Sequence, residues 1–250
     1  MRHPRRATPL GRRPFRPDPF GGGAYDGQMM FEQIARDAAA GRFDDWALST
    51  VIDENVKTPV ISPAQFFRLH AAAGIAATWP IGNAGLLHVY GYLLSTVPTP
   101  FGLKGDRWRD GALAQHLGLA MEAFVLEAAD LAGETVLQRV TDAALPHLAH
   151  PAAGLGDVLV IDDEVPEVED GAGADTATVF RTTVVNAPGH PGAALVYGVH
   201  EAGRMRLITA FPLANATPAS LDALAADPPR MHYNAALAAL PPRTPLRRRR

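Results

Sequence analysis

The sequence predicts an α+β fold, in which a helical N-terminal half packs on a C-terminal antiparallel β-sheet. Apolar residues recur at helical spacing between residues 28 and 150, whereas short β-branched runs between turn-forming residues occupy positions 157–212. The chain has 250 residues, 47% of them hydrophobic, which is enough to bury one core without covalent cross-links. We therefore expect a single domain over residues 28–240.

The N-terminal half contains recognisable helix start and stop signals. Met30 and Ile34 lie one helical turn apart, and Gly41 is a suitable end for that helix. The apolar residues from Trp46 to Val51 suggest a second, short helix.

The next helix start is the clearest in the chain. Ser62, Pro63 and Gln65 supply an N-cap hydroxyl, a first-turn proline and a capping-box glutamine. Further helices are expected over residues 82–97, 110–119 and 133–149.

The C-terminal half contains four runs with strand character. They cover residues 157–162, 178–186, 194–200 and 205–211. The last two flank a four-residue segment containing Gly203, which predicts a hairpin. Residues 163–176 form an acidic stretch between the first two runs, and we expect an exposed loop there.

Composition and motifs exclude several protein classes. The chain has no Cys, so it has no disulfide framework and no thiolate metal site. It contains neither the glycine fingerprint of a dinucleotide-binding fold nor a P-loop, and no His-Glu-x-x-His metal motif. We therefore expect no cofactor and no metal.

Charge is segregated along the chain. Residues 1–16 carry six Arg and residues 243–250 carry five, which leaves 12 basic against 26 acidic groups between them. Residues 1–27 are predicted to be a disordered leader rich in Arg, Pro and Gly, and residues 241–250 a basic tail. Because an acidic body repels phosphate, nucleic acid could bind only through these tails or a nuclease site. No membrane span or targeting signal is recognised, which favours a soluble, cytoplasmic protein.

The first candidate site combines one helix with the loop that follows it. His88 and Tyr92 are four residues apart and therefore share a helix face, and the loop adds Lys104, Arg107 and Trp108. An apolar pocket with such groups suits a cofactor-independent enzyme, a hydrolase or lyase, that binds a small anionic or aromatic molecule. His88 would be the general acid or base, and Tyr92 would be a hydrogen-bond donor. Lys104 and Arg107 would bind the anionic group of the substrate. In the alternative interpretation, His88 and Tyr92 are hydrogen-bonded core residues.

A second candidate site lies on the strands. His200 is the candidate catalytic residue, and Arg181, Arg206 and Thr209 are candidate binding residues if the strands pair. The alternative is a set of ordinary cross-strand pairs on a solvated face.

The same strands carry a resemblance to a known group of enzymes. The segments Tyr197–His200 and Arg206–Pro212 resemble the closing strands of bacterial ribonuclease toxins of the barnase, EndoU, colicin and RelE type. That resemblance implies metal-free RNA cleavage by His200, Arg206 and Thr209. A third possibility is a non-catalytic module that binds a macromolecular partner through the Arg-rich ends or the acidic loop.

Overall fold

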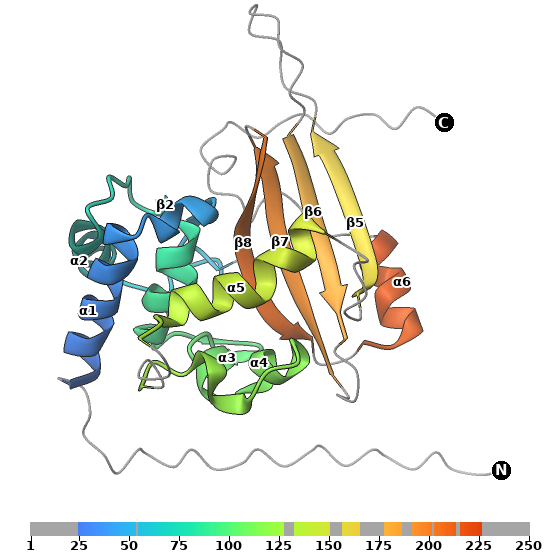
Figure 1. Cartoon of the computed structure of the whole chain (residues 1–250), viewed down its shortest axis with the longest axis horizontal. Helices are drawn as coiled ribbons and strands as arrows, with labels where there is room; N and C mark the ends of the chain where they lie inside the picture. The colour runs from blue at the N-terminus through green and yellow to red at the C-terminus, as the bar shows by residue number, and fades with distance from the viewer. Residues whose placement is uncertain are drawn as a thin grey trace, which may run out of the picture.

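The chain folds into a helical part beside a four-stranded antiparallel sheet, which confirms the predicted α+β class (Figure 1). The computed structural model describes residues 25–53, 55–127, 133–150, 157–165, 178–186, 192–201, 203–213 and 216–226. The predicted basic tail, nearly all of the predicted leader and most of the acidic loop lie outside these residues. No described helix has the length and apolar character needed to cross a membrane.

The helical part consists of short helices and two small strand pairs. The helices are α1 (Tyr25–Ala39), η1 (Arg42–Asp45), α2 (Pro63–Ala73), η2 (Leu86–Gly91), α3 (Asp106–Arg109), α4 (Ala112–His116), η3 (Met121–Phe124) and α5 (Val136–Ala149). The strand pairs are β1 (Leu48–Thr50) with β2 (Ile81–Asn83), and β3 (Pro98–Thr99) with β4 (Gly102–Leu103). The helix α1 thus begins at Tyr25, within the stretch assigned to the leader.

The capping box before α2 is confirmed. The Ser62 side chain accepts a hydrogen bond from the Gln65 backbone, and the Gln65 side chain accepts one from the Ser62 backbone. The helix expected from Trp46 to Val51 is wrong, because this segment forms β1 with Leu48 exposed and Ser49 buried. That alternation is the period of a strand, not of a helix.

The helix expected over residues 82–97 is also shorter than predicted. Gly82 and Asn83 belong to β2, and η2 is a π-helix in which the Tyr92 N–H bonds to the Leu87 carbonyl. Such wide turns are rare and occur frequently at functional sites. The expected helix over residues 110–119 is likewise reduced to the short α4.

The main sheet has the strand order β5-β6-β7-β8, with every pair antiparallel. Its strands are β5 (Asp157–Val165), β6 (Thr178–Val185), β7 (Ala193–Glu201) and β8 (Arg204–Leu213). The hairpin between β7 and β8 is confirmed, and pairing continues to Glu201 and Arg204, so its loop is shorter than four residues.

Helices cover both faces of this sheet. The helix α5 crosses one face over β6, β7 and β8 (Figure 1). It can approach closely because Gly198 has no side chain: a Cβ there would lie 2.4 Å from Leu148 Cδ1. The helix α6 (Pro218–Ala226) places Leu224 against the second apolar cluster, around Phe180 and Tyr197, on the other face.

The helical part is joined to the sheet along β8. The Ala47 N–H donates to the Leu207 carbonyl at 2.7 Å, and Ala84 in turn donates to the Ala47 carbonyl. A β-bulge at Ile208 interrupts the β7–β8 register, since Tyr197 pairs with Thr209 and Gly198 with Leu207. The bulge leaves the Ile208 carbonyl available to the helical part.

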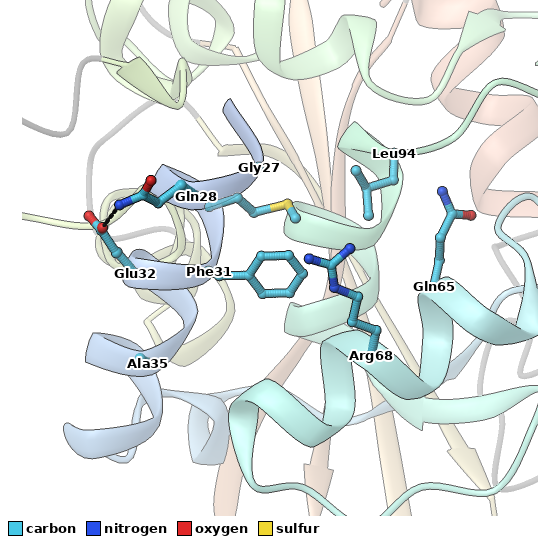
Figure 2. A pocket seen from close by; sticks show the side chains of 9 residues that line it. Gly27, Gln28, Phe31, Glu32, Ala35, Gln65, Arg68 and Leu94 are labelled. Carbon is cyan, nitrogen blue, oxygen red and sulfur yellow. Dashed lines mark hydrogen bonds between the residues drawn. The ribbon is translucent and has the colours of Figure 1, made fainter. Parts of the chain in front are cut away.

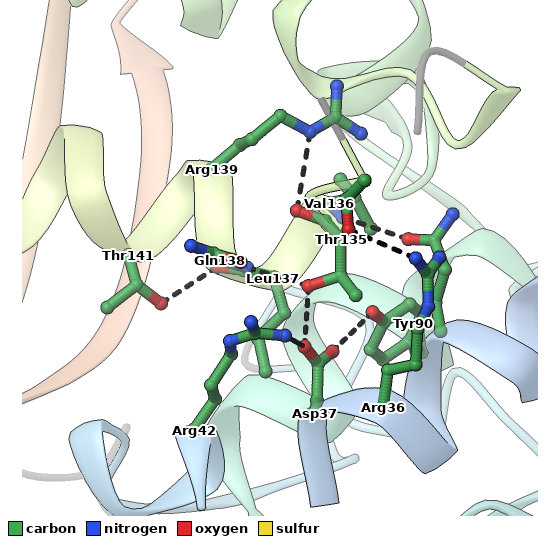
Figure 3. A network of polar contacts seen from close by, with 12 residues as sticks. Arg36, Asp37, Arg42, Tyr90, Thr135, Val136, Leu137, Gln138, Arg139 and Thr141 are labelled. Atoms are coloured by element: carbon green, nitrogen blue, oxygen red, sulfur yellow. Dashed lines mark hydrogen bonds and ion pairs between the residues drawn. The ribbon is translucent and has the colours of Figure 1, made fainter. Parts of the chain in front are cut away.

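A polar network lies within the helical core (Figure 3). The carboxylate of Asp37, in α1, is fully buried and accepts hydrogen bonds from the Tyr90 hydroxyl and the Thr135 hydroxyl. Arg42 adds an ion pair with an N–O distance of 2.9 Å. Four separate segments are thereby tied to one carboxylate. Burial, followed by the negative charge of Asp37, raises the pKa of the Tyr90 phenol well above its ordinary value.

Candidate functional site

The π-helix η2 places His88 between two elements of the fold. The Nδ1–H of His88 donates to the Ile208 carbonyl at the bulge, which fixes the orientation of the ring. A carbonyl oxygen can only accept, so Nδ1 carries the proton and a neutral ring has its lone pair on Nε2. Ser49 Oγ lies 3.2 Å from that Nε2, so the Ser49 hydroxyl donates to it.

Electrostatics keep this imidazole neutral. Burial lowers the pKa of His88 well below its ordinary value, and the charges of Arg107 and Lys104 lower it further. The hydrogen bond to Ile208 acts in the opposite direction but is outweighed. A neutral, oriented imidazole bonded to a hydroxyl is an arrangement that can serve as a general base.

Lys104 and Arg107 both lie against the ring of Tyr92. Lys104 Nζ is 4.5 Å and Arg107 Cζ 5.5 Å from the ring centroid. The His88 ring is 4.8 Å from the same centroid, so the two residues share a face as predicted. The Tyr92 hydroxyl makes no hydrogen bond within the described part of the chain.

The ammonium of Lys104 is neutralised by Asp53. The Nζ–Oδ2 distance is 2.7 Å, and both side chains are largely buried. Burial works to raise the pKa of Asp53, but Lys104 and the backbone N–H groups of Val56 and Asn55 lower it by more. The net shift is downward, which keeps Asp53 ionised near neutral pH.

Arg107, at the start of α3, reaches the edge of β8. Its Nη1 donates to Thr209 Oγ1 at 3.3 Å and to the Ala210 carbonyl at 3.2 Å. Its Cζ also lies 5.8 Å from the centroid of Phe211. Burial lowers the pKa of Arg107, while Tyr92 and Asp53 act to raise it. Arg107 makes no ion pair with any residue that the structure describes.

Trp108 is buried next to His88. It is 1% exposed, and its indole N–H donates to the His88 carbonyl at 3.1 Å. That bond ties α3 to η2. Trp108 is about as buried as Ser49 and Tyr92, and its predicted contact with a substrate stays a prediction.

The structure therefore brings together most of the first predicted set. His88, Tyr92, Lys104 and Arg107 meet Thr209 of the second set, in what we call the β8-edge cluster. The cluster also contains three residues that sequence reasoning missed, namely Ser49, Asp53 and Phe211. Ser49 lies in the segment misassigned as a helix, and Asp53 follows that segment. Recognising the alternation of β1 would have identified Ser49 as buried.

The second predicted set is not brought together. His200 is exposed near the end of β7, where it pairs with Met205, whereas Thr209 pairs with Tyr197 farther along the strand. Arg181 is held by Asp162, at 2.7 and 2.8 Å, and by the Leu148 carbonyl. Arg206 is half-buried opposite Val199. The four residues therefore do not converge on one point of the described surface.

A cavity lies elsewhere, between α1 and α2. Figure 2 shows this cavity, of about 710 Å³, with Phe31, Arg68 and Leu94 among its lining residues. The Arg68 guanidinium covers the Phe31 ring at 4.4 Å. None of the predicted site residues lines it. Among the described residues, no cluster of three or more His, Asp or Glu is arranged to hold a metal ion.

Comparisons with known proteins return no relative. No protein-family model, no curated protein sequence and no solved structure matches the chain.

Proposed function

We propose that this protein is a cofactor-independent enzyme that uses general acid-base chemistry on a small anionic or aromatic molecule bound at the β8-edge cluster. One observation carries the proposal. Arg107 is a half-buried guanidinium with no anionic partner among the described residues. Because a buried charge without a counter-ion is costly, a fold that retains one has a use for an anion there.

The surrounding residues have distinct roles in this proposal. Arg107 binds the anionic group, while Lys104 stays paired with Asp53 beside the Tyr92 ring. The Tyr92 hydroxyl donates a hydrogen bond to the bound molecule. His88 is the base, because its Nε2 lone pair faces Ser49 Oγ at 3.2 Å.

Ser49 connects the base to the substrate. When His88 Nε2 accepts the Ser49 proton, the oxygen of Ser49 can take a proton from the substrate. It can instead attack a carbonyl carbon of the substrate; the bond from that carbon to the leaving group then breaks, and the leaving group takes the proton from His88. The Nδ1–H bond to Ile208 prevents the ring from turning away during this transfer. Burial excludes bulk water from both groups, which strengthens their interaction with the reacting molecule.

The test is a turnover screen followed by matched variants. The full chain is incubated with a mixture of small carboxylates, their esters and aromatic metabolites, and proton NMR follows the consumption of each compound. Ser49→Ala and His88→Gln should each slow the reaction by about 100-fold or more, the usual contribution of general acid-base catalysis. The matched control is His200→Gln, an exposed histidine outside the cluster, which should retain the activity of the parent chain.

Two results would reject the proposal. One is the absence of turnover of every compound in the screen. The other is Ser49→Ala and His88→Gln proteins that fold normally and remain as active as the parent. Cleavage of a short RNA that His200→Gln abolishes would instead favour the ribonuclease alternative.

A further inference from the structure

The charges of the β8-edge cluster limit what it can bind. The charges of Lys104 and Asp53 cancel each other, and His88 is neutral. Arg107 therefore leaves the cluster with one positive charge in excess. The nearby Asp106 is exposed and directs its carboxylate to the Leu103 N–H instead of to Arg107. Within the described cluster, the net charge therefore matches a ligand with a single negative charge.

The geometry of Arg107 narrows the choice of anion. Its described hydrogen bonds all use Nη1, so Nε and Nη2 keep their N–H groups for a ligand. These two nitrogens form a planar fork that matches the two oxygens of a carboxylate. The Tyr92 and Phe211 rings lie 5.5 and 5.8 Å from Cζ. Tyr92 is 4% exposed, whereas Phe211 is only partly buried and leaves apolar surface beside the fork.

We propose that the Arg107 fork binds the carboxylate of a small monocarboxylate whose aromatic or apolar body lies against Phe211. This inference rests on the proposed function, because it specifies the substrate class of the same site. A phosphate dianion fits less well, since the second cation that would balance it, Lys104, is already paired with Asp53 at 2.7 Å. Three features of the cluster thus agree: its excess positive charge, its planar donors and the partly exposed ring of Phe211.

Isothermal titration calorimetry on the full chain can test this assignment with three probes. Benzoate carries a planar monoanion on a ring, inorganic phosphate carries the anion without the ring, and benzyl alcohol carries the ring without the charge. Benzoate should bind at least about ten-fold more tightly than either of the others, because only it uses both the fork and the Phe211 ring.

Four variants locate the binding. Arg107→Gln should weaken benzoate binding by about ten-fold or more. Arg107→Lys should also weaken benzoate binding, because the charge remains but the planar pair of donors is lost. Arg109→Gln removes an exposed arginine from the same helix and should change nothing. Asp53→Asn releases Lys104 and should shift the preference toward phosphate. Circular dichroism checks that each variant folds, and Arg107→Lys replaces Arg107→Gln if the latter does not.

The possible failures are distinguishable. In the first, phosphate binds more tightly than benzoate, and phosphate binding is abolished in Arg107→Gln. That result overturns the monocarboxylate assignment but supports an anion site at Arg107. If benzyl alcohol matches benzoate, the carboxylate is not recognised, and the assignment is also overturned. If none of the probes binds at millimolar concentration, this inference fails, and the turnover screen decides the proposed function separately.

Discussion

Tyr90 and Tyr92 are two residues apart on one helical segment, yet their phenol groups have opposite surroundings. The Tyr90 hydroxyl donates to the buried carboxylate of Asp37. The Tyr92 hydroxyl has no hydrogen bond among the described residues, and two cations lie against its ring. One phenol belongs to a closed network in the core, and the other belongs to the open β8-edge cluster.

The difference lies in how completely each charge is satisfied. Asp37 has Arg42 as a counter-ion and two hydroxyl donors in addition. Arg107 has only a hydroxyl and a carbonyl as described partners, and its remaining donors are unused. A closed network stabilises the fold, whereas an open one has capacity left for a ligand.

Removing the carboxylate of the closed network should have the largest effect. In Asp37→Ala, the Tyr90 and Thr135 hydroxyls and the Arg42 guanidinium lose their common acceptor in a fully buried place. The free energy of unfolding, measured by urea denaturation, should fall by about 3 to 5 kcal/mol. Asp44→Ala, which removes an exposed carboxylate from η1, should stay within about 0.5 kcal/mol. Equal losses in the two variants would mean that Asp37 is not part of a satisfied network.

The two tyrosines provide the direct comparison. Tyr90→Phe should lower the free energy of unfolding by about 1.5 to 3 kcal/mol, because it deletes a buried hydrogen bond to a charged group. Tyr92→Phe should change it by less than about 0.5 kcal/mol, since the ring and its cation contacts remain. The measurement is again urea denaturation. A Tyr92→Phe protein as unstable as Tyr90→Phe would show that both phenols are structural.

Sequence patterns predicted the fold class and the four long strands because these depend on local periodicity. The helical spacing also predicted that His88 and Tyr92 share a helix face. Lys104 and Arg107 were expected beside that face, because they lie on the loop that directly follows the helix. Patterns could not rank Tyr90 against Tyr92, since the partner of Tyr90 lies far away in the chain.

The strand residues were harder to predict for a different reason. Thr209 was expected beside His200, but the bulge at Ile208 and the β7–β8 register place it toward Arg107. A bulge has no unique sequence signature, so the neighbours of an edge strand cannot be assigned from alternation alone. The same bulge exposes the Ile208 carbonyl that accepts the hydrogen bond from His88. The orientation of His88 therefore depends on a bulge that cannot be predicted from the sequence.

The last predicted effect is a pH dependence that separates the two clusters. The pKa of His88 is lowered in the fold, so the unfolded chain binds the proton first as pH falls below about 6.5. The stability that His88 contributes is thus present above that pH and is lost on acidification, at about 1.4 kcal/mol per pH unit at most. The slope of unfolding free energy against pH, measured by urea denaturation between pH 7.5 and 5, should be shallower in His88→Gln by that amount.

Tyr90→Phe should keep the slope of the parent chain, because the pKa of Tyr90 is raised and the phenol stays protonated throughout this range. A parent-like slope in His88→Gln would mean that His88 is not held neutral by its surroundings, and the β8-edge cluster would then lack its base.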